Sequence, residues 1–310
     1  MGLIASANVV AVAGHTNPDG DAVGAMNAMA GCVARMWKSV FVFTEDYSER
    51  FNCIPGGGFR YTGDSDLLCP DLFISLDCGS KERLGKFMGL FDRSAATVNI
   101  DHHETNPCYA DVNLVDAEAS STCEIIFDLI NMYVLIDPEI AAALYAGLVY
   151  DTGGFRHVNA TSKAYGIAAR LIDVGFDHSG LYNELMHIRS FTEAKCFGKA
   201  LNNMFTVRSG RVAASLVTAE ELKELKADGK DVDGISEYLL GIRGVSASVF
   251  AYAKSEEVTQ LSFRSKTVDV GQIARELGGG GHRYAAGCKL SCGAEEALKN
   301  GVDALTAAGA

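Results

Sequence analysis

The stretch GHTNPDGD, residues 14–21, lies between an apolar run at residues 8–13 and an Ala- and Met-rich stretch at residues 21–35. The apolar run is short and β-branched, which predicts a buried strand, and the following stretch predicts a helix. Because Pro18 fixes one φ angle and Gly20 permits an unusual one, we expect a rigid turn. Side chains at the carboxyl end of a parallel strand face the crevice where open α/β sheets bind ligands. Residues 14–21 are therefore expected at a ligand site.

This turn contains an imidazole and two carboxylates, those of His15, Asp19 and Asp21. Together they offer nitrogen and oxygen ligands for a divalent metal ion. Asp19 or Asp21 could equally cap the helix that follows, because Asp is a favoured N-cap residue. The turn by itself leaves both interpretations open.

The composition is that of a globular protein with room for two domains. The chain has 310 residues, of which 48% are hydrophobic and 21% charged, which is ordinary for such proteins. It has no apolar run near the roughly 18 residues of a membrane span, and its N-terminus lacks the features of a secretory signal. Nine scattered cysteines without a CxxC pair favour free thiols. We therefore expect a cytoplasmic protein without a membrane partner.

The net charge of −12 argues against a protein that coats long nucleic acid, since such proteins gain affinity from many cationic phosphate contacts. Small phosphorylated substrates remain compatible, because they need only a local cluster of cations and metal ions.

Residues 1–180 are expected to form an α/β domain, because apolar strands alternate with helical stretches and so predict a mostly parallel sheet with helices on both faces. After the strand at residues 8–13, we expect strands at residues 39–43, 72–76 and 97–100, then helices at residues 121–132, 138–150 and 162–174. A helical linker is expected at residues 181–204.

Residues 205–310 are expected to form a second, smaller α/β domain. The predicted strands are residues 211–217, 245–253, 258–263 and 286–290, with a hairpin connection at residues 254–257. The predicted helices are residues 219–226 and 270–277 and a final helix from Glu295. A glycine-rich loop, GGGGH at residues 278–282, follows the helix at 270–277.

Three of the four strands predicted in the first domain end in Asp or His. With the carboxylate at residue 151, the ends of strands and helices in this domain carry His15, Asp19, Asp21, Asp77, Asp101, His102, His103 and Asp151. Such a set without thiolate suits Mn²⁺ or Mg²⁺ better than a closed zinc site. The alternative is a collection of separate helix caps and hydrogen-bonded core histidines, which rarely explains all eight residues together.

Six or more ligand-type groups exceed what one catalytic ion with open positions needs. Two ions about 3.5–4 Å apart, bridged by one carboxylate, would use them all. Such a pair activates a bridging water and clamps the attacking and leaving oxygens in phosphoryl transfer. A nearby histidine can donate the leaving-group proton.

These residues resemble the motifs of a known family. His15-xxx-Asp19-x-Asp21, Asp77 after a strand, Asp101-His102-His103 and Asp151-Thr152-Gly153 are similar to the four motifs of the DHH phosphoesterases. The run at residues 278–282, with Ala285-Ala286-Gly287, resembles the glycine-rich motif of the DHH-associated C-terminal domain. The resemblance covers nearly the whole chain. In its length, the chain most resembles the family's branch of oligoribonucleases and 3′-phosphoadenosine 5′-phosphate phosphatases.

The resemblance implies a role for each motif residue. One ion would be held by His15, Asp19 and Asp77, and a second by Asp21, Asp77, His102 and Asp151, so that Asp77 bridges the two. His103 would face the scissile phosphate as a donor or general acid, and Asp101 would orient a histidine from behind. The ions implied are most simply Mn²⁺, with Mg²⁺ or Co²⁺ as alternatives.

Several further residues are candidates for contacts with phosphate. Arg156 lies beside the last metal motif, which favours a phosphate or catalytic role, whereas Arg83 fits a phosphate contact and a solvated helix face equally well. In the second domain, successive glycines let the backbone approach a ligand closely. The resemblance assigns that domain to the nucleotide distal to the cut, and the candidate residues there are Arg264, Ser265, Gly279, Gly280, Gly281, His282 and Arg283.

The function expected is a two-metal phosphoesterase that hydrolyses oligoribonucleotides of about 2–5 nucleotides to mononucleotides, and 3′-phosphoadenosine 5′-phosphate to AMP. The partners are then short RNAs and 3′,5′-bisphosphonucleosides, accepted in a cleft between the domains, and the apolar helices of the first domain leave room for a homodimer. Alternatives are a linear or cyclic dinucleotide phosphodiesterase, and a pyrophosphatase or exopolyphosphatase, against which the motif at 278–282 argues. A catalytically inactive nucleotide sensor is the alternative outside enzymes, although every motif position is filled.

Overall fold

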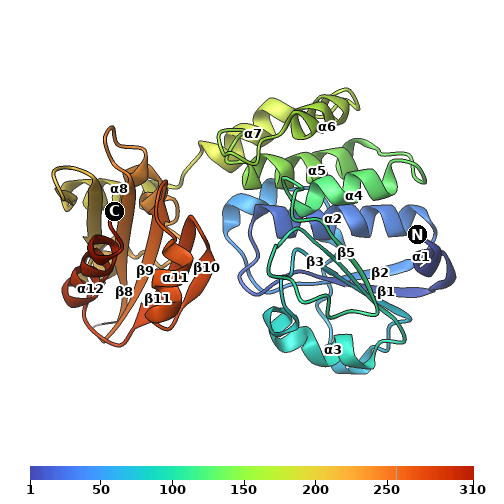
Figure 1. The fold of residues 1–310 in the computed structure, drawn as a ribbon. Helices are drawn as coiled ribbons and strands as arrows, with labels where there is room; N and C mark the ends of the chain where they lie inside the picture. The colour runs from blue at the N-terminus through green and yellow to red at the C-terminus, as the bar shows by residue number, and fades with distance from the viewer. Residues whose placement is uncertain (256) are drawn as a thin grey trace. The chain divides into compact units, whose positions relative to one another are not determined.

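The computed structural model of the chain describes residues 1–255 and 257–310. It contains two compact units, Met1–Ile188 and Arg189–Ala310 (Figure 1). The linker predicted at residues 181–204 spans the boundary between these units and includes the end of one helix, α7, and the whole of the next, α8.

The first unit is built on a five-stranded, fully parallel sheet with the strand order β2-β1-β3-β4-β5. Its strands are β1 (Val9–Ala13), β2 (Ser39–Phe43), β3 (Leu72–Leu76), β4 (Thr97–Asp101) and β5 (Val112–Val115). The four predicted strands are confirmed. Strand β5 was not predicted, because this edge strand has only four residues, two of them exposed and two half-buried, and so lacks the apolar run of its neighbours.

Helices cover both faces of this sheet, as predicted. Its α-helices are α1 (Gly2–Ser6), α2 (Gly20–Arg35), α3 (Met88–Arg93), α4 (Thr122–Ile130), α5 (Pro138–Asp151), α6 (Ser162–Ile172) and α7 (His178–Met186). Four 3-10 helices complete the unit: η1 (Glu49–Cys53), η2 (Gly57–Phe59), η3 (Ser65–Leu67) and η4 (Lys81–Phe87). Helices α2, α4 and α5 share one core with one face of the sheet, and η4 and α3 pack on Phe43 and Phe73 of the other face.

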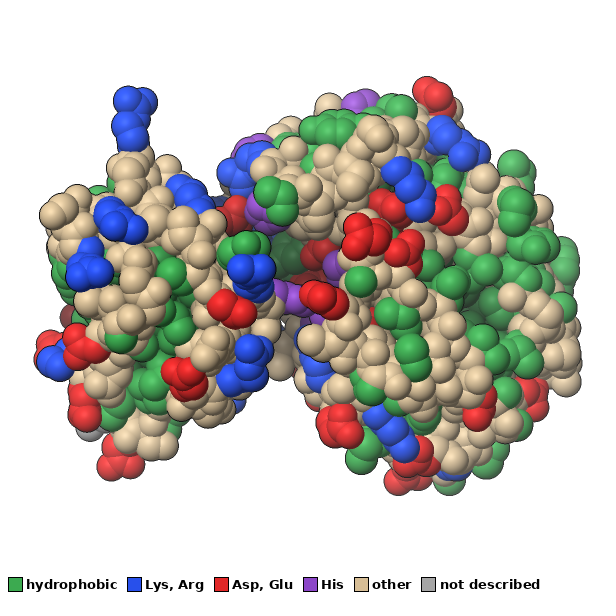
Figure 2. All heavy atoms as spheres, viewed as in Figure 1, with side chains coloured by type: hydrophobic (Ala, Val, Ile, Leu, Met, Phe, Trp, Pro, Cys, Tyr) green, Lys and Arg blue, Asp and Glu red, His purple; other side chains and the backbone are tan. Residues whose placement is uncertain are grey.

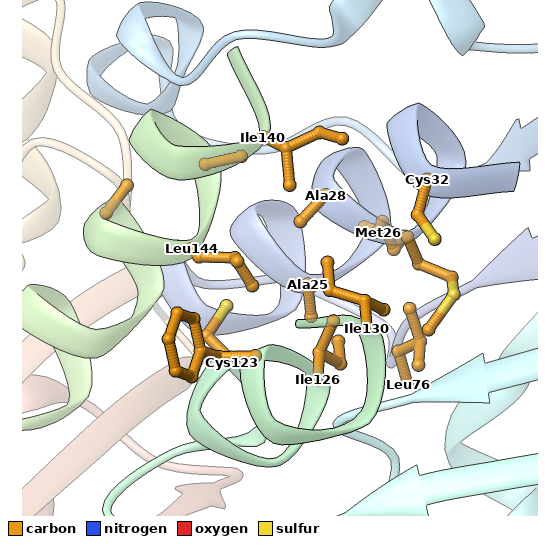
Figure 3. Packing of buried hydrophobic residues seen from close by; sticks show 14 of the residues in the cluster. Ala25, Met26, Ala28, Cys32, Leu76, Cys123, Ile126, Ile130, Ile140 and Leu144 are labelled. Atoms are coloured by element: carbon orange, nitrogen blue, oxygen red, sulfur yellow. The ribbon is translucent and has the colours of Figure 1, made fainter. Parts of the chain in front are cut away.

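Helix α2 is the centre of the larger core, since every residue from Gly20 to Val33 is buried. Figure 3 shows its small side chains, such as Ala25 and Ala28, packed among side chains of α4 and α5. The helices approach closely enough that a Cβ on Gly24 would lie 2.5 Å from the Ala143 carbonyl oxygen. This close packing fixes the two helix ends that carry candidate ligands, the start of α2 and the end of α5.

The second unit contains a six-stranded mixed sheet with the order β10-β11-β9-β8-β7-β6, in which only the β7–β8 pair is parallel. Its strands are β6 (Phe205–Val207), β7 (Val212–Val217), β8 (Ala247–Ser255), β9 (Val258–Ser265), β10 (Gly280–His282) and β11 (Ala285–Leu290). Its helices are α8 (Phe191–Asn202), α9 (Ala219–Leu225), α10 (Ile235–Leu240), α11 (Val270–Glu276) and α12 (Ala294–Ala307).

The alternation of side chains along β8 gives this sheet two buried faces. Val249 packs in a core with α11 and α12, whereas its neighbour Phe250 packs in another core with α8, α9 and α10. The second unit is thus an α/β domain, as the sequence indicates.

The sequence did not predict β6 or α10, and two further details of the second unit differ from the expectation. The predicted glycine-rich loop is partly a strand, because Gly280–His282 forms β10 and pairs antiparallel with β11. The predicted hairpin connection at residues 254–257 begins too early, because β8 continues to Ser255; Glu256, also within that connection, lies outside the described residues.

Two further properties follow from the described residues. All nine cysteines are free thiols, as expected. No helix among residues 1–255 and 257–310 is both long enough and apolar enough to span a membrane. On the visible face of each unit, acidic, basic and apolar side chains are interspersed (Figure 2).

Candidate metal centre

The candidate ligands meet at the carboxyl edge of the parallel sheet. His15 and Asp19 lie on the turn from β1 into α2, and Asp21 lies in the first turn of α2. Asp77 follows β3, and His102 follows β4. These three strands are neighbours in the sheet, so that their ends converge. The close packing of α5 on α2 adds its last residue, Asp151.

His15 faces two carboxylates through one ring nitrogen. Its Nδ1 lies 2.8 Å from the Thr16 carbonyl oxygen, which accepts a hydrogen bond from Nδ1–H and leaves Nε2 as the ligand-type nitrogen. Nε2 lies 3.6 Å from Asp77 Oδ2 and 3.9 Å from Asp19 Oδ2. His15, Asp19 and Asp77 thus form one group with the spacing of a metal site.

His102 is the centre of a second group, with Asp21 and Asp151. Its Nε2 lies 3.6 Å from Asp151 Oδ2 and 3.5 Å from Asp77 Oδ1. Asp77 therefore directs one carboxylate oxygen toward His15 and the other toward His102. That is the geometry a carboxylate needs to bridge two ions.

Asp19 combines the two interpretations that the sequence left open. Its Oδ1 caps α2, accepting hydrogen bonds from the backbone N–H groups of Asp21 and Ala22 at 3.0 and 3.1 Å. Its Oδ2 faces His15. The residue is a helix cap and a member of the cluster at the same time.

The buried carboxylates interact strongly. Burial, together with the nearby charge of Asp77, raises the pKa of Asp21 to about 7. Burial also pushes the pKa of Asp77 upward, but His102, His15 and His103 outweigh it, and the pKa is lowered overall. Burial opposes charge on His102, yet Asp151, Asp77 and Asp21 raise its pKa to about 9. The cluster is thus a concentration of negative charge that cations stabilise.

Divalent cations fit this donor set. Ligand atoms that share an ion at about 2.1 Å lie roughly 3 to 4 Å from one another, and the four N–O distances given above fall in this range. The donors are imidazole nitrogens and carboxylate oxygens, which suit Mn²⁺ and similar ions.

Thr122 supports this cluster, although the sequence did not indicate it as a site residue. Its hydroxyl donates to Asp77 Oδ1 at 3.1 Å, and its backbone N–H donates to Asp21 Oδ2 at 2.7 Å. The Cys123 N–H donates to the other oxygen of Asp21 at 3.1 Å. The sequence does indicate a helix start at Ser121 or Thr122, and Ser121 is the cap that accepts from Glu124 N–H. No sequence pattern indicates that the next hydroxyl reaches a carboxylate 45 residues away.

His103 occupies a different position from the two groups described above. Its Nδ1 donates to Asp101 Oδ1 at 2.7 Å, and Asp101 is fully buried. The ring also lies near Asp77 and His102, so that a third group of metal-ligand type includes it. Its Nδ1, however, is occupied by the hydrogen bond to Asp101, which belongs to none of the three groups.

Arg156 follows an unusual turn at the end of α5. Gly153, Gly154 and Phe155 all have positive φ angles, of 58°, 69° and 63°, and the Thr152 hydroxyl accepts from the Phe155 N–H at 3.1 Å. A left-handed Phe is strained and persists only where its surroundings hold it. The Arg156 Nε–H donates to the Gly153 carbonyl at 2.9 Å. Arg83, the other candidate, accepts from the Thr16 N–H through its carbonyl oxygen at 2.7 Å.

The candidates of the second unit lie on β9 and on or beside β10, the two strands that pair with opposite edges of β11. Ala285 of β11 pairs with His282 on one side and with Arg264 on the other. The Ser265 hydroxyl oxygen accepts from the N–H groups of Thr267 and Val268 at 3.0 and 2.9 Å, so it holds a turn. Arg283 follows β10 directly.

The glycines of this region differ in what the fold requires. A Cβ on Gly279 would lie 2.5 Å from Cys288 Cβ, and one on Gly281 would lie 2.6 Å from Ala286 Cα. Both positions therefore exclude a side chain through packing within the unit. Gly280 has nothing within 4 Å of such a Cβ, so packing gives no reason for a glycine there.

Comparisons with known proteins agree with this arrangement. Residues 9–148 match the DHH family, N-terminal domain, and residues 210–308 match the DHHA1 domain. A Thermus thermophilus protein named bifunctional oligoribonuclease and PAP phosphatase NrnA is 30% identical over 284 residues, which cover 90% of this chain and 83% of the relative. A Bacillus subtilis protein of the same name is 27% identical, with 89% and 87% covered.

A solved structure shares the whole fold. It is an exopolyphosphatase-related protein from Bacteroides fragilis, with a TM-score of 0.91 at 25% identity, covering 99% of this chain and 94% of that protein. The chain therefore belongs to the DHH phosphoesterase family, with a DHH domain followed by a DHHA1 domain, and is a metal-dependent hydrolase.

Proposed function

We propose that the protein hydrolyses oligoribonucleotides of about 2–5 nucleotides to mononucleotides and 3′-phosphoadenosine 5′-phosphate to AMP, using two metal ions. The observation that carries the two-metal part is Asp77, whose two oxygens face different histidines at 3.5 and 3.6 Å. The choice of substrates is supported by the names of the Thermus and Bacillus relatives.

The residues of each group would hold one ion. His15, Asp19 and Asp77 would hold the first, and the second would be held by Asp77 with Asp21, His102 and Asp151. When bound, the two ions supply an activated water and neutralise the charge of the phosphoryl group. Mn²⁺ is the ion we propose, because mixed imidazole and carboxylate ligands suit it.

The chain itself then provides the proton and the positive charge. His103, held by Asp101 at 2.7 Å, would donate a proton to the sugar oxygen that leaves phosphorus. Arg156 would stabilise negative charge on the phosphate as a fixed cation. Hydrolysis then breaks one P–O bond and releases a sugar hydroxyl.

The second unit would hold the part of the substrate distal to the cut. Gly280 is exposed, and among the described residues of the unit no atom lies within 4 Å of a Cβ at this position, so packing there does not explain its lack of a side chain. A substrate phosphate that approaches the backbone closely would explain it. Arg264, His282 and Arg283 would add charge and hydrogen bonds there, with Gly279, Gly281 and Ser265 shaping the surface.

The assay that tests this function compares four substrate classes with Mn²⁺-loaded protein. We expect mononucleotide release from a 5′-phosphorylated di- to pentaribonucleotide and phosphate release from 3′-phosphoadenosine 5′-phosphate. A cyclic dinucleotide and inorganic pyrophosphate or polyphosphate should be turned over at least about tenfold more slowly. Faster hydrolysis of either of these would replace the proposed substrates, and no turnover with two ions bound would refute the function.

The proposal extends to the cellular setting and the oligomeric state. We place the protein in the cytoplasm, where short RNAs arise, and regard a homodimer through the first unit as compatible with its apolar helices. Fractionation of cells and the mass of the protein in solution test these two points.

A further inference from the structure

A buried polar cluster lies behind His103 and is not part of the metal groups. We call it the Asn106 cluster; its members are Ser75, Asn99, Asp101, Asn106 and Tyr109. Ser75, Asn99 and Asp101 are completely buried. Burying so many polar groups is unfavourable unless each finds hydrogen-bond partners in one arrangement. Such a cluster therefore specifies the orientation of its members more narrowly than an apolar core does.

Asp101 connects this cluster to the candidate general acid. Its Oδ1 accepts from His103 Nδ1, and its other oxygen, Oδ2, accepts from Asn106 Nδ2. The two hydrogen bonds fix the rotation of the carboxylate, which in turn fixes the plane of the imidazole ring. Because Nδ1 carries the proton shared with Asp101, Nε2 is the nitrogen that can exchange a proton with substrate.

Asn106 is itself held from both ends of its amide. Its Nδ2 also donates to Asn99 Oδ1 at 2.7 Å, while its Oδ1 accepts from the Cys108 N–H at 2.8 Å. The backbone donor identifies the oxygen, so the amide cannot be turned over without losing these contacts. Asn106 therefore presents a donor, and not an acceptor, to Asp101.

The rest of the cluster fixes Asn99. Its Nδ2 donates to Ser75 Oγ at 3.0 Å and to Tyr109 Oη at 3.1 Å. The Tyr109 hydroxyl donates to the Cys78 carbonyl oxygen at 3.0 Å. Residues of strands β3 and β4 thus fix the orientation of Asn99, which in turn fixes that of Asn106.

We propose that Asn106 is a positioning residue for the reaction: it holds Asp101, and through Asp101 it aims His103 at the leaving-group oxygen. This inference rests on the proposed function, because it concerns the proton donor of that reaction. The mechanism needs no contact between Asn106 and substrate or metal.

Asn106→Asp is the informative variant. It keeps the shape of the side chain and the oxygen that accepts from Cys108, but it replaces the donor facing Asp101 by an acceptor. Asn113→Asp is the matched control. Asn113 lies on β5, the strand that follows the segment of Asn106, and makes the same kind of contacts, donating to the Ala110 carbonyl at 2.7 Å and accepting from the Ala110 N–H at 3.1 Å, yet its amide does not hydrogen-bond Asp101. Asn106→Ala is the second variant if the added charge prevents folding.

Each variant is measured on two substrates that differ in the leaving group. A 5′-phosphorylated diribonucleotide releases a sugar hydroxyl, which needs a proton donor, whereas the 4-nitrophenyl ester of a nucleoside 5′-phosphate releases a stable phenolate, which does not. We expect Asn106→Asp to lower kcat on the dinucleotide about tenfold or more, with KM and ester turnover within about twofold of wild type. Bound Mn²⁺ should stay unchanged, and Asn113→Asp should behave like wild type on both substrates.

Equal losses on both substrates, or no loss on the dinucleotide, would overturn the positioning role. The wild-type protein separates this from a failure of the proposed function. If it binds Mn²⁺ but does not cleave the dinucleotide, the function itself is wrong, whatever the variants do.

Discussion

In the first unit the candidate ligands Asp21 and Asp77 are enclosed, at 1% and 2% exposure, whereas every residue of β10 in the second unit is exposed. Hydrogen bonds fix the ligands in advance, as the bonds from Thr122 to Asp77 and Asp21 illustrate. On β10, Gly280 leaves open space. The difference separates two tasks: a preorganised centre suits bond cleavage, and an open strand edge suits recognition of a phosphate by backbone groups.

The largest effect should follow from Asp77→Asn, which removes the charge that the two groups share. We expect kcat/KM to fall on the order of a thousandfold or more and bound Mn²⁺ to drop below two ions. The metal-free variant should unfold at a lower temperature than metal-free wild type, because the burial of Asp77 is outweighed by His102, His15 and His103, which stabilise its charge and hold its pKa below the usual value. Calorimetry with and without Mn²⁺ checks this, and an unchanged metal content would contradict the bridging role.

A smaller loss should follow from Thr122→Val, which removes the hydroxyl that donates to Asp77 and keeps the backbone bond to Asp21. Loss of such a supporting hydrogen bond lowers metal affinity about 10–100-fold. Thr97→Val is the matched control, because its hydroxyl donates to Asp111 at 2.8 Å, away from the centre. That control should cost about 1–3 kcal/mol of stability and leave Mn²⁺ affinity unchanged. Equal Mn²⁺ affinity in both variants would show that Thr122 does not support the metal centre.

The smallest effect is expected in the second unit. Gly280→Val should raise KM for a dinucleotide about tenfold, with kcat and the unfolding temperature close to wild type, because a Cβ at this position has no described atom within 4 Å. Gly281→Ala is the contrast: at a φ of 139° and with its Cβ against Ala286, it should destabilise the unit by at least about 1 kcal/mol. A Gly280→Val variant with normal KM would show that β10 does not face substrate.

The same contrast explains what could be predicted from the sequence. The cluster of metal-ligand residues could be predicted from the sequence because the ends of parallel strands β1, β3 and β4 meet at one edge of the sheet. An Asp or His that follows each of these strands must therefore lie close to the others in space. Strand β10 was not visible, since glycine has low strand propensity and pairing with β11 decides its conformation. Edge strand β5 was missed for its short, half-exposed pattern.

The supporting residues were missed for another reason. Thr122 and Asn106 act through contacts with Asp77 and Asp101, and their side chains carry no distinctive chemistry of their own. One reaches 45 residues along the chain. The other lies five residues from its partner but depends on Asn99 for its orientation. The orientation of these two side chains is determined only by tertiary packing.

The central claim is that Asp77 joins two metal ions in one centre. Electron paramagnetic resonance of the protein titrated with Mn²⁺ tests it directly, because two ions bridged by a carboxylate about 3.5–4 Å apart couple magnetically. We predict a coupled spectrum at two equivalents in wild type, which Asp77→Asn abolishes. Two equivalents that give only the six-line signal of isolated Mn²⁺ would contradict the claim.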